Sequence, residues 1–502
     1  MAEQESAEKN VLATYRLNAK GLIADVIIRD KGGFVNEYEV SMQGIGNATK
    51  VLLTSLRPEL LSIVPIDPSR VDDKEYEAEL ILKYTDASNL VINKYLPGTT
   101  EAVRKMLVAF IINMLLGLGE LEVPLSDENL EEVAINGSRD MLWVFHRQYG
   151  WCKTNIALKD EEEIYDYSEQ IGRKVGRQIS NLNPLMDAEL LDGSRVNATL
   201  YPISQAGNTI TIRKFSKNPW SMVALVANKT LSLEMAALTW LCVQNEISLL
   251  ISGGTASGKT SFLNALGIFM PANRRVISVE ETRELTLPDF LQWLPMLTRQ
   301  PNPEGKGEVT LYNLMINALR QRPDILLVGE IRTKEDAQTL FEAIHTGHAV
   351  YGTLHADNAS NTIVRMSNPP INISKLILNA LGGIVNLFRH RRLGVRRLLE
   401  FGEMLGSGDI SVIERWDINN DSFVKIGDMT RLADTIGLYS GFTRQEISQD
   451  IVEKGEILNW MVTNKVSMVD DAGYVVANYY KNPSKILQAV KDNAAFSKKM
   501  FG

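Results

Sequence analysis

Residues 253–260 have the types and spacing needed to hold a polyphosphate, because they match the pattern G-x-x-x-x-G-K-[ST] at every position: Gly253, Gly254, Thr255, Ala256, Ser257, Gly258, Lys259 and Thr260. Glycines let the backbone turn its N–H groups onto phosphate oxygens, and Lys259 places a point charge near the β- and γ-phosphates. Thr260 offers a hydroxyl to Mg²⁺, and a helix beginning here adds its positive end. With Ser261 as the next residue, this stretch is predicted to bind nucleotide.

The sequence around this loop has the order strand, loop, helix. Residues 247–252 form a short apolar run typical of a buried parallel strand. After the loop, Phe262, Leu263, Leu266 and Phe269 recur at helical spacing until Pro271. A glycine-rich turn without a ligand is the alternative interpretation, and the flanking elements favour the phosphate site.

Carboxylates follow two further predicted strands. Glu280 and Glu281 come after residues 275–279, and Glu330 comes two residues after residues 325–328. In open α/β sheets, ligands bind beyond the carboxyl ends of the strands. We interpret Glu280 as the base that orients water and Glu330 as the metal-side acid beside Thr260, with Glu281 an alternative base. Usual P-loop enzymes have Asp where Gly329 stands, which leaves this division of labour open.

Three histidines, His345, His348 and His355, lie close together in the sequence. No cysteine is near, and a probable helix end at Gly347 separates the first two, which argues against a metal site. A structural role is one alternative. We favour a polar role in sensing the nucleotide, with His355 as the candidate site residue.

The composition argues against a nucleic-acid-binding protein and against a secreted one. The 502 residues have a net charge of −8, which argues against nucleic-acid binding as the main activity. Cys152 and Cys242 are the two cysteines, far apart in the sequence, which is typical of a reduced cytosolic protein. The acidic N-terminus does not have the pattern of a secretory signal, and the apolar stretch 106–118 is predicted to be a buried helix.

Changes in pattern predict five regions. Residues 1–100 have an unclear role, 101–215 form an α/β domain, and 216–230 a linker. Residues 231–405 alternate strands and helices, which predicts a mostly parallel sheet covered on both faces. Residues 406–502 are predicted to be mainly helical, with a capping box at 443–446.

The motifs in their order resemble the type II/type IV secretion ATPases. They are the loop 253–260, the acidic box 279–282, the stretch 328–332 and the histidine box 347–355. The stretches 146–150, 192–197 and 211–215 look most like the archaeal branch, which drives archaellum, pilus and secretion machines. The resemblance covers roughly residues 125–405.

The resemblance implies a RecA-like P-loop motor domain after an α/β N-terminal domain, a helical C-terminal cap, and a homo-hexameric ring. It also implies that Arg195 and Arg213 reach the nucleotide, where a second cation would offset charge that develops during phosphoryl transfer. Each arginine could instead be solvated or ion-paired. The four-cysteine zinc insert of bacterial members has no counterpart here, so no structural zinc is expected.

The expected function is therefore that of a ring motor that hydrolyses ATP with Mg²⁺ and powers filament assembly or protein secretion. It would act through a polytopic membrane platform protein, and indirectly on pilin-like subunits or secreted substrates. The expected location is cytoplasmic, at the inner face of the membrane. The alternatives are a nucleotide-gated scaffold and a nucleic-acid translocase. The basic cluster 389–397 could meet nucleic acid, lipid or protein, and no aromatic interleaving supports base stacking.

Overall fold

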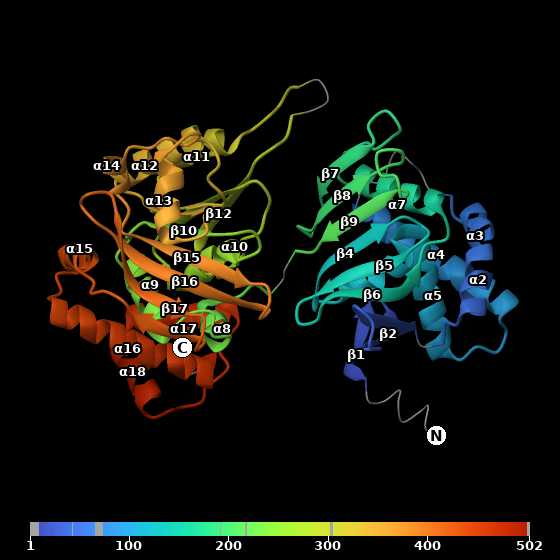
Figure 1. The fold of residues 1–502 in the computed structure, drawn as a ribbon. Helices are drawn as coiled ribbons and strands as arrows, with labels where there is room; N and C mark the ends of the chain where they lie inside the picture. The colour runs from blue at the N-terminus through green and yellow to red at the C-terminus, as the bar shows by residue number, and fades with distance from the viewer. Residues whose placement is uncertain are drawn as a thin grey trace. The chain divides into compact units, whose positions relative to one another are not determined.

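Two nine-stranded sheets organise the chain, each in its own unit: residues 1–216 and residues 217–502 (Figure 1). The computed structural model describes residues 10–42, 44–65, 74–190, 192–215, 218–301 and 305–498. Each unit is described by itself.

The sheet of the first unit has the order β1-β2-β3-β6-β5-β4-β9-β8-β7. Its strand pairs are antiparallel apart from β3 and β6, which run parallel. The strands are β1 (Val11–Ala19), β2 (Leu22–Arg29), β3 (Asn36–Met42), β4 (Leu130–Asn136), β5 (Met141–His146), β6 (Gly150–Ala157), β7 (Leu185–Glu189), β8 (Arg195–Thr199) and β9 (Thr209–Arg213). The helices are α2 (Asn47–Ser55), α3 (Arg57–Ile63), α4 (Lys74–Tyr95), α5 (Glu101–Leu116), η2 (Gly119–Leu121), α6 (Glu122–Ser126) and α7 (Glu161–Lys174).

The first hundred residues share this sheet with residues 130–213, although we expected the two regions to be separate. Strand β3 pairs with β6 through Asn36, Glu37 and Tyr38. Alternate residues of β2 and β3, among them Val26 and Tyr38, are fully buried in the same hydrophobic core as β4–β9. The alternation of buried and less buried residues in β2 and β3 therefore places their apolar side chains in the same core as those of β4–β9.

The sheet of the second unit has the order β12-β11-β13-β14-β10-β15-β16-β17-β18. The strands from β12 to β15 are parallel, and β16–β18 add an antiparallel extension. The strands are β10 (Leu249–Gly253), β11 (Arg275–Glu280), β12 (Gln292–Leu297), β13 (Ile325–Val328), β14 (Ala349–Leu354), β15 (Gly383–His390), β16 (Val395–Met404), β17 (Ile410–Asp417) and β18 (Ser422–Lys425). The helices are α8 (Met222–Ala227), α9 (Leu233–Gln244), α10 (Lys259–Ala265), η3 (Leu266–Phe269), α11 (Leu311–Leu319), α12 (Lys334–His345), α13 (Ala359–Ser367), α14 (Lys375–Leu378), α15 (Arg431–Ser440), α16 (Arg444–Thr463), α17 (Val469–Lys481) and α18 (Pro483–Lys491).

Helices cover both faces of this sheet. One hydrophobic core contains side chains of α11–α14, and the other contains side chains of α8–α10 and α15–α18, as their placement in Figure 1 also shows. Strands β10, β13 and β14 lie between these cores and are buried along their whole length, which explains their continuous apolar sequence.

The boundaries at 216–230 and 406–502 differ from the sequence prediction. Ser216 and Lys217 lie outside the described residues, and α8 packs into the core through the buried Met222 and Val223. Residues 410–425 form β17 and β18, which extend the sheet, and the mainly helical part begins at Arg431.

Hydrogen bonds of Trp240 and Tyr480 connect the C-terminal helix α17 to α9 and η3, which pack against the sheet. Trp240 of α9 donates to the hydroxyl of Tyr480 at 2.8 Å, and Tyr480 donates to the carbonyl of Phe269 at 2.7 Å. Lys454 is fully buried, bonded to Asp450, with its ammonium 5.5 Å from the centre of the Trp240 ring. The C-terminal helices are therefore part of the same packed unit as the helix that follows the 253–260 loop.

Each unit holds one of the two cysteines, and both are buried and unpaired. Burial raises the pKa of Cys152 to about 11 and raises that of Cys242 as well. No single helix among the described ranges is long and apolar enough to cross a membrane, while α5 taken with the bent segment 119–126 passes a test of length and composition. The expected buried helix over 106–118 is the C-terminal part of α5.

Candidate nucleotide-binding site

The 253–260 loop connects the end of β10 to the start of α10. Gly253 has no room for a side chain, because a Cβ there would collide with the Leu387 carbonyl and the Ser257 hydroxyl. Gly258 precedes the helix with φ +102° and Ala256 has φ +57°, both in the left-handed region. Alternation of left- and right-handed residues turns successive N–H groups toward one side, which makes a concave anion site at the N-terminus of α10.

Lys259 is held inside this site. Its side chain is 8% exposed, and its ammonium donates to the Gly254 carbonyl at 3.0 Å. The same nitrogen lies 3.4 Å from Nδ1 of His355. Burial lowers the pKa of Lys259, and the charge of Glu330 opposes that shift. The ammonium thus has neutral partners that a phosphate oxygen could replace.

A chain of polar side-chain contacts runs from Lys259 to Glu330, after β13, and to Glu281, after β11. Nε2 of His355 lies 2.9 Å from Oε1 of Glu330. The guanidinium of Arg332 contacts Oε2 of Glu330 at 2.6 Å and Glu281 at 2.8 Å. Burial and then the charge of Lys259 lower the pKa of His355, so a neutral imidazole with its proton on Nε2 fits both of its contacts.

Glu280 has a different environment from its neighbour Glu281. It is 2% exposed, and Oε1 accepts from the backbone N–H groups of Glu284 and Leu285 at 2.9 and 3.1 Å. Its Oε2 is buried without a hydrogen-bond partner. Burial raises the pKa of Glu280 from 4.5 to about 7. A buried carboxylate with one oxygen free of hydrogen bonds and a pKa near 7 has the properties of a general base.

Gly329 lies against Glu280. Its backbone N–H donates to the Val279 carbonyl at 2.9 Å, and a Cβ there would come within 3.5 Å of Glu280. The ends of β11 and β13 are therefore adjacent, which brings Glu280 and Glu330 to the same edge of the sheet. A Cβ at 329 would make only ordinary van der Waals contacts with Glu280, so the structure gives no steric reason for glycine at this position.

His345 and His348 lie at the end of α12, away from the chain of contacts that contains His355. Nδ1 of His345 contacts the Phe341 carbonyl at 2.7 Å, and Nδ1 of His348 contacts the Ala343 carbonyl at 3.0 Å. Both imidazoles thus contact backbone carbonyls of the last turns of α12. Across the described ranges, no cluster of three or more His, Cys, Asp or Glu side chains could hold a metal by itself.

A Mg²⁺ site shared with a nucleotide needs fewer protein ligands. Mg²⁺ usually keeps several waters and takes one or two protein oxygens together with phosphate oxygens. The half-buried Thr260 and the carboxylate of Glu330 fit that donor set.

Arg195 and Arg213 lie in the first unit, where they are cross-strand partners of β8 and β9. Residues directly opposite each other in an antiparallel pair project from the same face, and like charges there are destabilising. Arg195 has a long contact of 3.9 Å with Asp187. Arg213 also lies opposite Glu132 of β4, so carboxylates neighbour both arginines.

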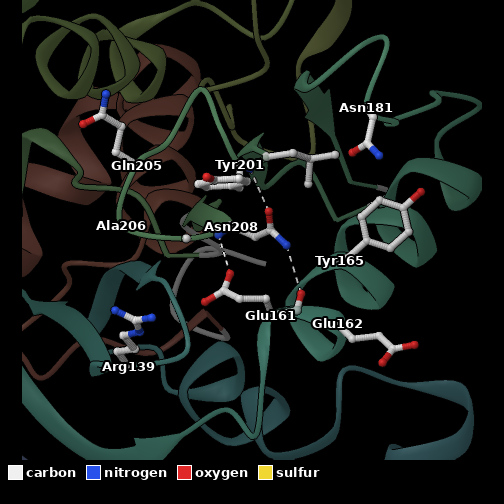
Figure 2. Close-up of a pocket in the computed structure, with 11 residues that line it drawn as sticks. Arg139, Glu161, Glu162, Tyr165, Asn181, Tyr201, Gln205, Ala206 and Asn208 are labelled. Carbon is white, nitrogen blue, oxygen red and sulfur yellow. Dashed lines mark hydrogen bonds between the residues drawn. The ribbon is translucent and has the colours of Figure 1, made fainter.

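A cavity of about 610 Å³ also lies in the first unit (Figure 2). Glu161 and Asn208 form its inner wall, and the rings of Tyr165 and Tyr201 line its sides. Both oxygens of Glu161 accept from the backbone, from Ser138 at 2.7 Å and Asn208 at 2.5 Å. Glu161 therefore ties three chain segments together, and its carboxylate is not available for chemistry.

Comparison with known proteins places the chain in a family. The sequence profile described as Type II/IV secretion system protein matches residues 166–397. The putative conjugal transfer protein MT3759 of Mycobacterium tuberculosis is 30% identical over 303 residues, which are 59% of this chain and 82% of that protein. The chain belongs to the type II/IV secretion system family.

Other members differ in length from this one. The uncharacterised protein MJ0781 of Methanocaldococcus jannaschii is 37% identical over 351 residues, and the match covers 68% of this chain but 46% of that relative. The crystal structure of the pilus retraction motor PilT with bound ADP matches at 17% identity and a TM-score of 0.40, over 74% of this chain and 94% of PilT. The parallel order β15-β10-β14-β13-β11, with the phosphate-binding loop after β10, gives this family member a RecA-like fold.

One site residue was missed from the sequence. Arg332 was noted as part of the motif 328–332 without a role, yet it joins Glu281 and Glu330. Its position two residues after Glu330 was the available signal, because residues i and i+2 of an extended segment project to the same side.

Proposed function

We propose that this chain is an ATP-hydrolysing motor of a type II/IV secretion or pilus-type machine. The observation that carries the proposal is the continuous set of contacts Lys259–His355–Glu330–Arg332–Glu281 beside the phosphate-binding loop. Binding of the phosphates requires the loop backbone and Lys259, and none of the other side chains in this set. The additional acids and the histidine supply groups that respond to the γ-phosphate and to water.

The division of labour follows from the environments of the side chains. Lys259 and the loop backbone bind the phosphates, and Glu280, with one open oxygen, orients and deprotonates the attacking water. Thr260 and Glu330 hold Mg²⁺, which neutralises phosphate charge when bound. His355 contacts both Lys259 and Glu330, so displacement of Lys259 by nucleotide reaches Glu330 through the imidazole.

We also propose that the chain works as an assembly with copies of itself and with a membrane protein. In this proposal Arg195 and Arg213 act on the nucleotide, and the working form is a homo-hexamer. The motor acts from the cytoplasm on a polytopic membrane platform protein, and through it on pilin-like subunits or secreted substrates. Filaments of the archaellum type are one candidate output.

Phosphate release from ATP tests the proposal directly. The wild-type chain should release phosphate in the presence of Mg²⁺, and Lys259→Ala should not. A nucleotide-gated scaffold would bind ATP with similar affinity but show no turnover above the Lys259→Ala background, with or without membranes from the native cell. A translocase would instead show hydrolysis stimulated by DNA and suppressed by salt.

A further inference from the structure

The basic cluster 389–397 divides into residues with different surroundings. Arg391 and Arg392 are exposed in the turn between β15 and β16. Arg397, on β16, is 5% exposed and forms a two-bond ion pair with Asp421 at 2.8 and 3.0 Å. Neighbouring residues of a strand face opposite ways, so Arg396 projects to the other side of β16.

Arg396 reaches the phosphate-binding loop. Its Nε donates to the carbonyl of Ala256 at 3.1 Å, across 140 residues of sequence. The position of a Cβ on Gly258 would lie 3.9 Å from Cδ of Arg396, so the side chain also covers the loop next to the start of α10. Arg396 therefore contacts the loop at both Ala256 and Gly258.

The residue that Arg396 holds has a strained backbone. Ala256 has φ +57°, a conformation that residues with a Cβ rarely adopt and that persists only where the surroundings fix it. The hydrogen bond comes from a charged donor, and such bonds are stronger than neutral ones. Glycine would adopt this conformation without strain, but the sequence has alanine here.

The bond also orients an N–H group. The carbonyl and N–H of a trans peptide point in opposite directions. With the Ala256 carbonyl turned toward Arg396, the N–H of Ser257 points to the Gly254 carbonyl at 3.4 Å, on the side where Lys259 lies. A phosphate oxygen could replace the Gly254 carbonyl as the acceptor of this long hydrogen bond.

We propose that Arg396 is a positioning residue of the nucleotide site. Its guanidinium holds the 256–257 peptide in the orientation that aims the Ser257 N–H at a phosphate, and this inference rests on the proposed nucleotide-binding function. Because Arg397 fixes β16 to the β17–β18 turn through Asp421, the position of the antiparallel extension sets the shape of the loop. Nucleotide affinity then depends on residues of the extension that do not touch the nucleotide.

Direct ATP binding by Arg396→Ala tests the inference, with Arg392→Ala as the matched control from the exposed turn of the same hairpin. Arg396→Ala should raise the Kd for ATP about tenfold and raise KM more than it lowers kcat. Arg392→Ala should change Kd less than twofold. Both should melt within a few degrees of the wild type without nucleotide, and Arg396→Gln, which keeps a donor, should have an intermediate Kd.

A second substitution separates positioning from a general loss of charge. In an Ala256→Gly background the strain is gone, so Arg396→Ala should raise Kd less than threefold. An unchanged tenfold effect in that background would overturn the inference, as would equal effects of Arg396→Ala and Arg392→Ala. If Lys259→Ala abolishes binding while Arg396→Ala binds like the wild type, only this inference fails. If the wild type and Lys259→Ala are alike, the proposed function fails.

Discussion

The two candidate charge sites of the molecule are built in opposite ways. At the edge of the parallel sheet, Lys259, His355, Glu330 and Arg332 are joined by contacts of 2.6–3.4 Å, and Glu280 is buried beside them. In the first unit, Arg195 and Arg213 are partners across two strands and share one face. The first group is thus held together by side-chain contacts, whereas the two arginines are related by the pairing of their strands.

The largest expected effect is that of Lys259→Ala, which removes the cation at the centre of the fixed site. Turnover should fall by about 10³-fold or more, because nothing then replaces the charge on the β- and γ-phosphates. Phosphate release measures the effect, and Lys334→Ala, an exposed lysine on α12, is the control. Parent-level hydrolysis by a folded Lys259→Ala protein would falsify the assignment of the site.

Glu280→Gln should abolish hydrolysis and keep ATP binding, because glutamine preserves the hydrogen bonds of Oε1 but cannot take a proton. The loss should be about 10²–10⁴-fold, the usual contribution of a general base. In the wild type, the rate should rise between pH 6 and 8 with a midpoint near 7, as the pKa of Glu280 requires. An active Glu280→Gln with an inactive Glu281→Gln would move the base to Glu281.

Glu280→Gln should also change how the stability of the folded protein depends on pH. The folded-state pKa of Glu280 lies above 4.5, so the folded protein holds this proton more tightly than the unfolded chain. The resulting stabilisation is complete below pH 4.5 and is lost as the pH rises through about 7. Glu280→Gln should therefore raise the melting temperature at pH 8 more than at pH 5. An equal change at both values would show that burial of the charge is not what shifts the pKa.

Glu330→Gln should reduce turnover by about 10²-fold and weaken its dependence on Mg²⁺, because a neutral amide is a weaker ligand for Mg²⁺ than a carboxylate. Titration of activity with Mg²⁺ measures this, with Glu335→Gln on α12 as a control. An unchanged Mg²⁺ midpoint would place the metal on another carboxylate.

Arg195→Ala and Arg213→Ala should each lower kcat by about 10–10³-fold with little change in ATP affinity, as expected for cations that act on charge formed in phosphoryl transfer. Arg173→Ala, an exposed residue of α7 paired with Glu169, serves as the control. Equal losses in kcat and affinity would show that the pair binds the nucleotide ground state, and the contrast with the Lys259 site would disappear.

The smallest effect concerns the exposed turn of the basic cluster. The double change Arg391→Ala with Arg392→Ala should lower the membrane-bound fraction in native-cell extracts about twofold at low salt. It should have no effect at high salt, because exposed charges are screened within a Debye length of about 8 Å at 0.15 M. Lys481→Ala with Lys485→Ala, on exposed positions of the C-terminal helices, is the control. A salt-independent loss would point to a specific contact.

The elements of the second unit were predictable where local signals are strong. Strand β13 has the predicted bounds, and Thr443 forms the capping box expected at 443–446. The antiparallel strands β17 and β18 and the pairing of β3 with β6 were not predicted. Strand pairing joins residues far apart in the chain, and a period of two does not specify the partner strand.

In the candidate site too, the sequence predicted the residues of the local motifs but not the contacts that depend on strand order. The motifs named Lys259, Glu330 and His355, and the structure places these side chains in contact. The roles of Arg332 and Arg396 depend on which strand ends meet, and this follows from the sheet order rather than from spacing.

The two buried cysteines have a practical consequence. Thiol reagents react with the thiolate, which burial suppresses at Cys152 and Cys242, so the native chain offers little background to maleimide dyes. One cysteine introduced on an exposed position of each unit would then carry a donor and an acceptor fluorophore. Energy transfer between them would report the distance between the units through each cycle of nucleotide binding and release.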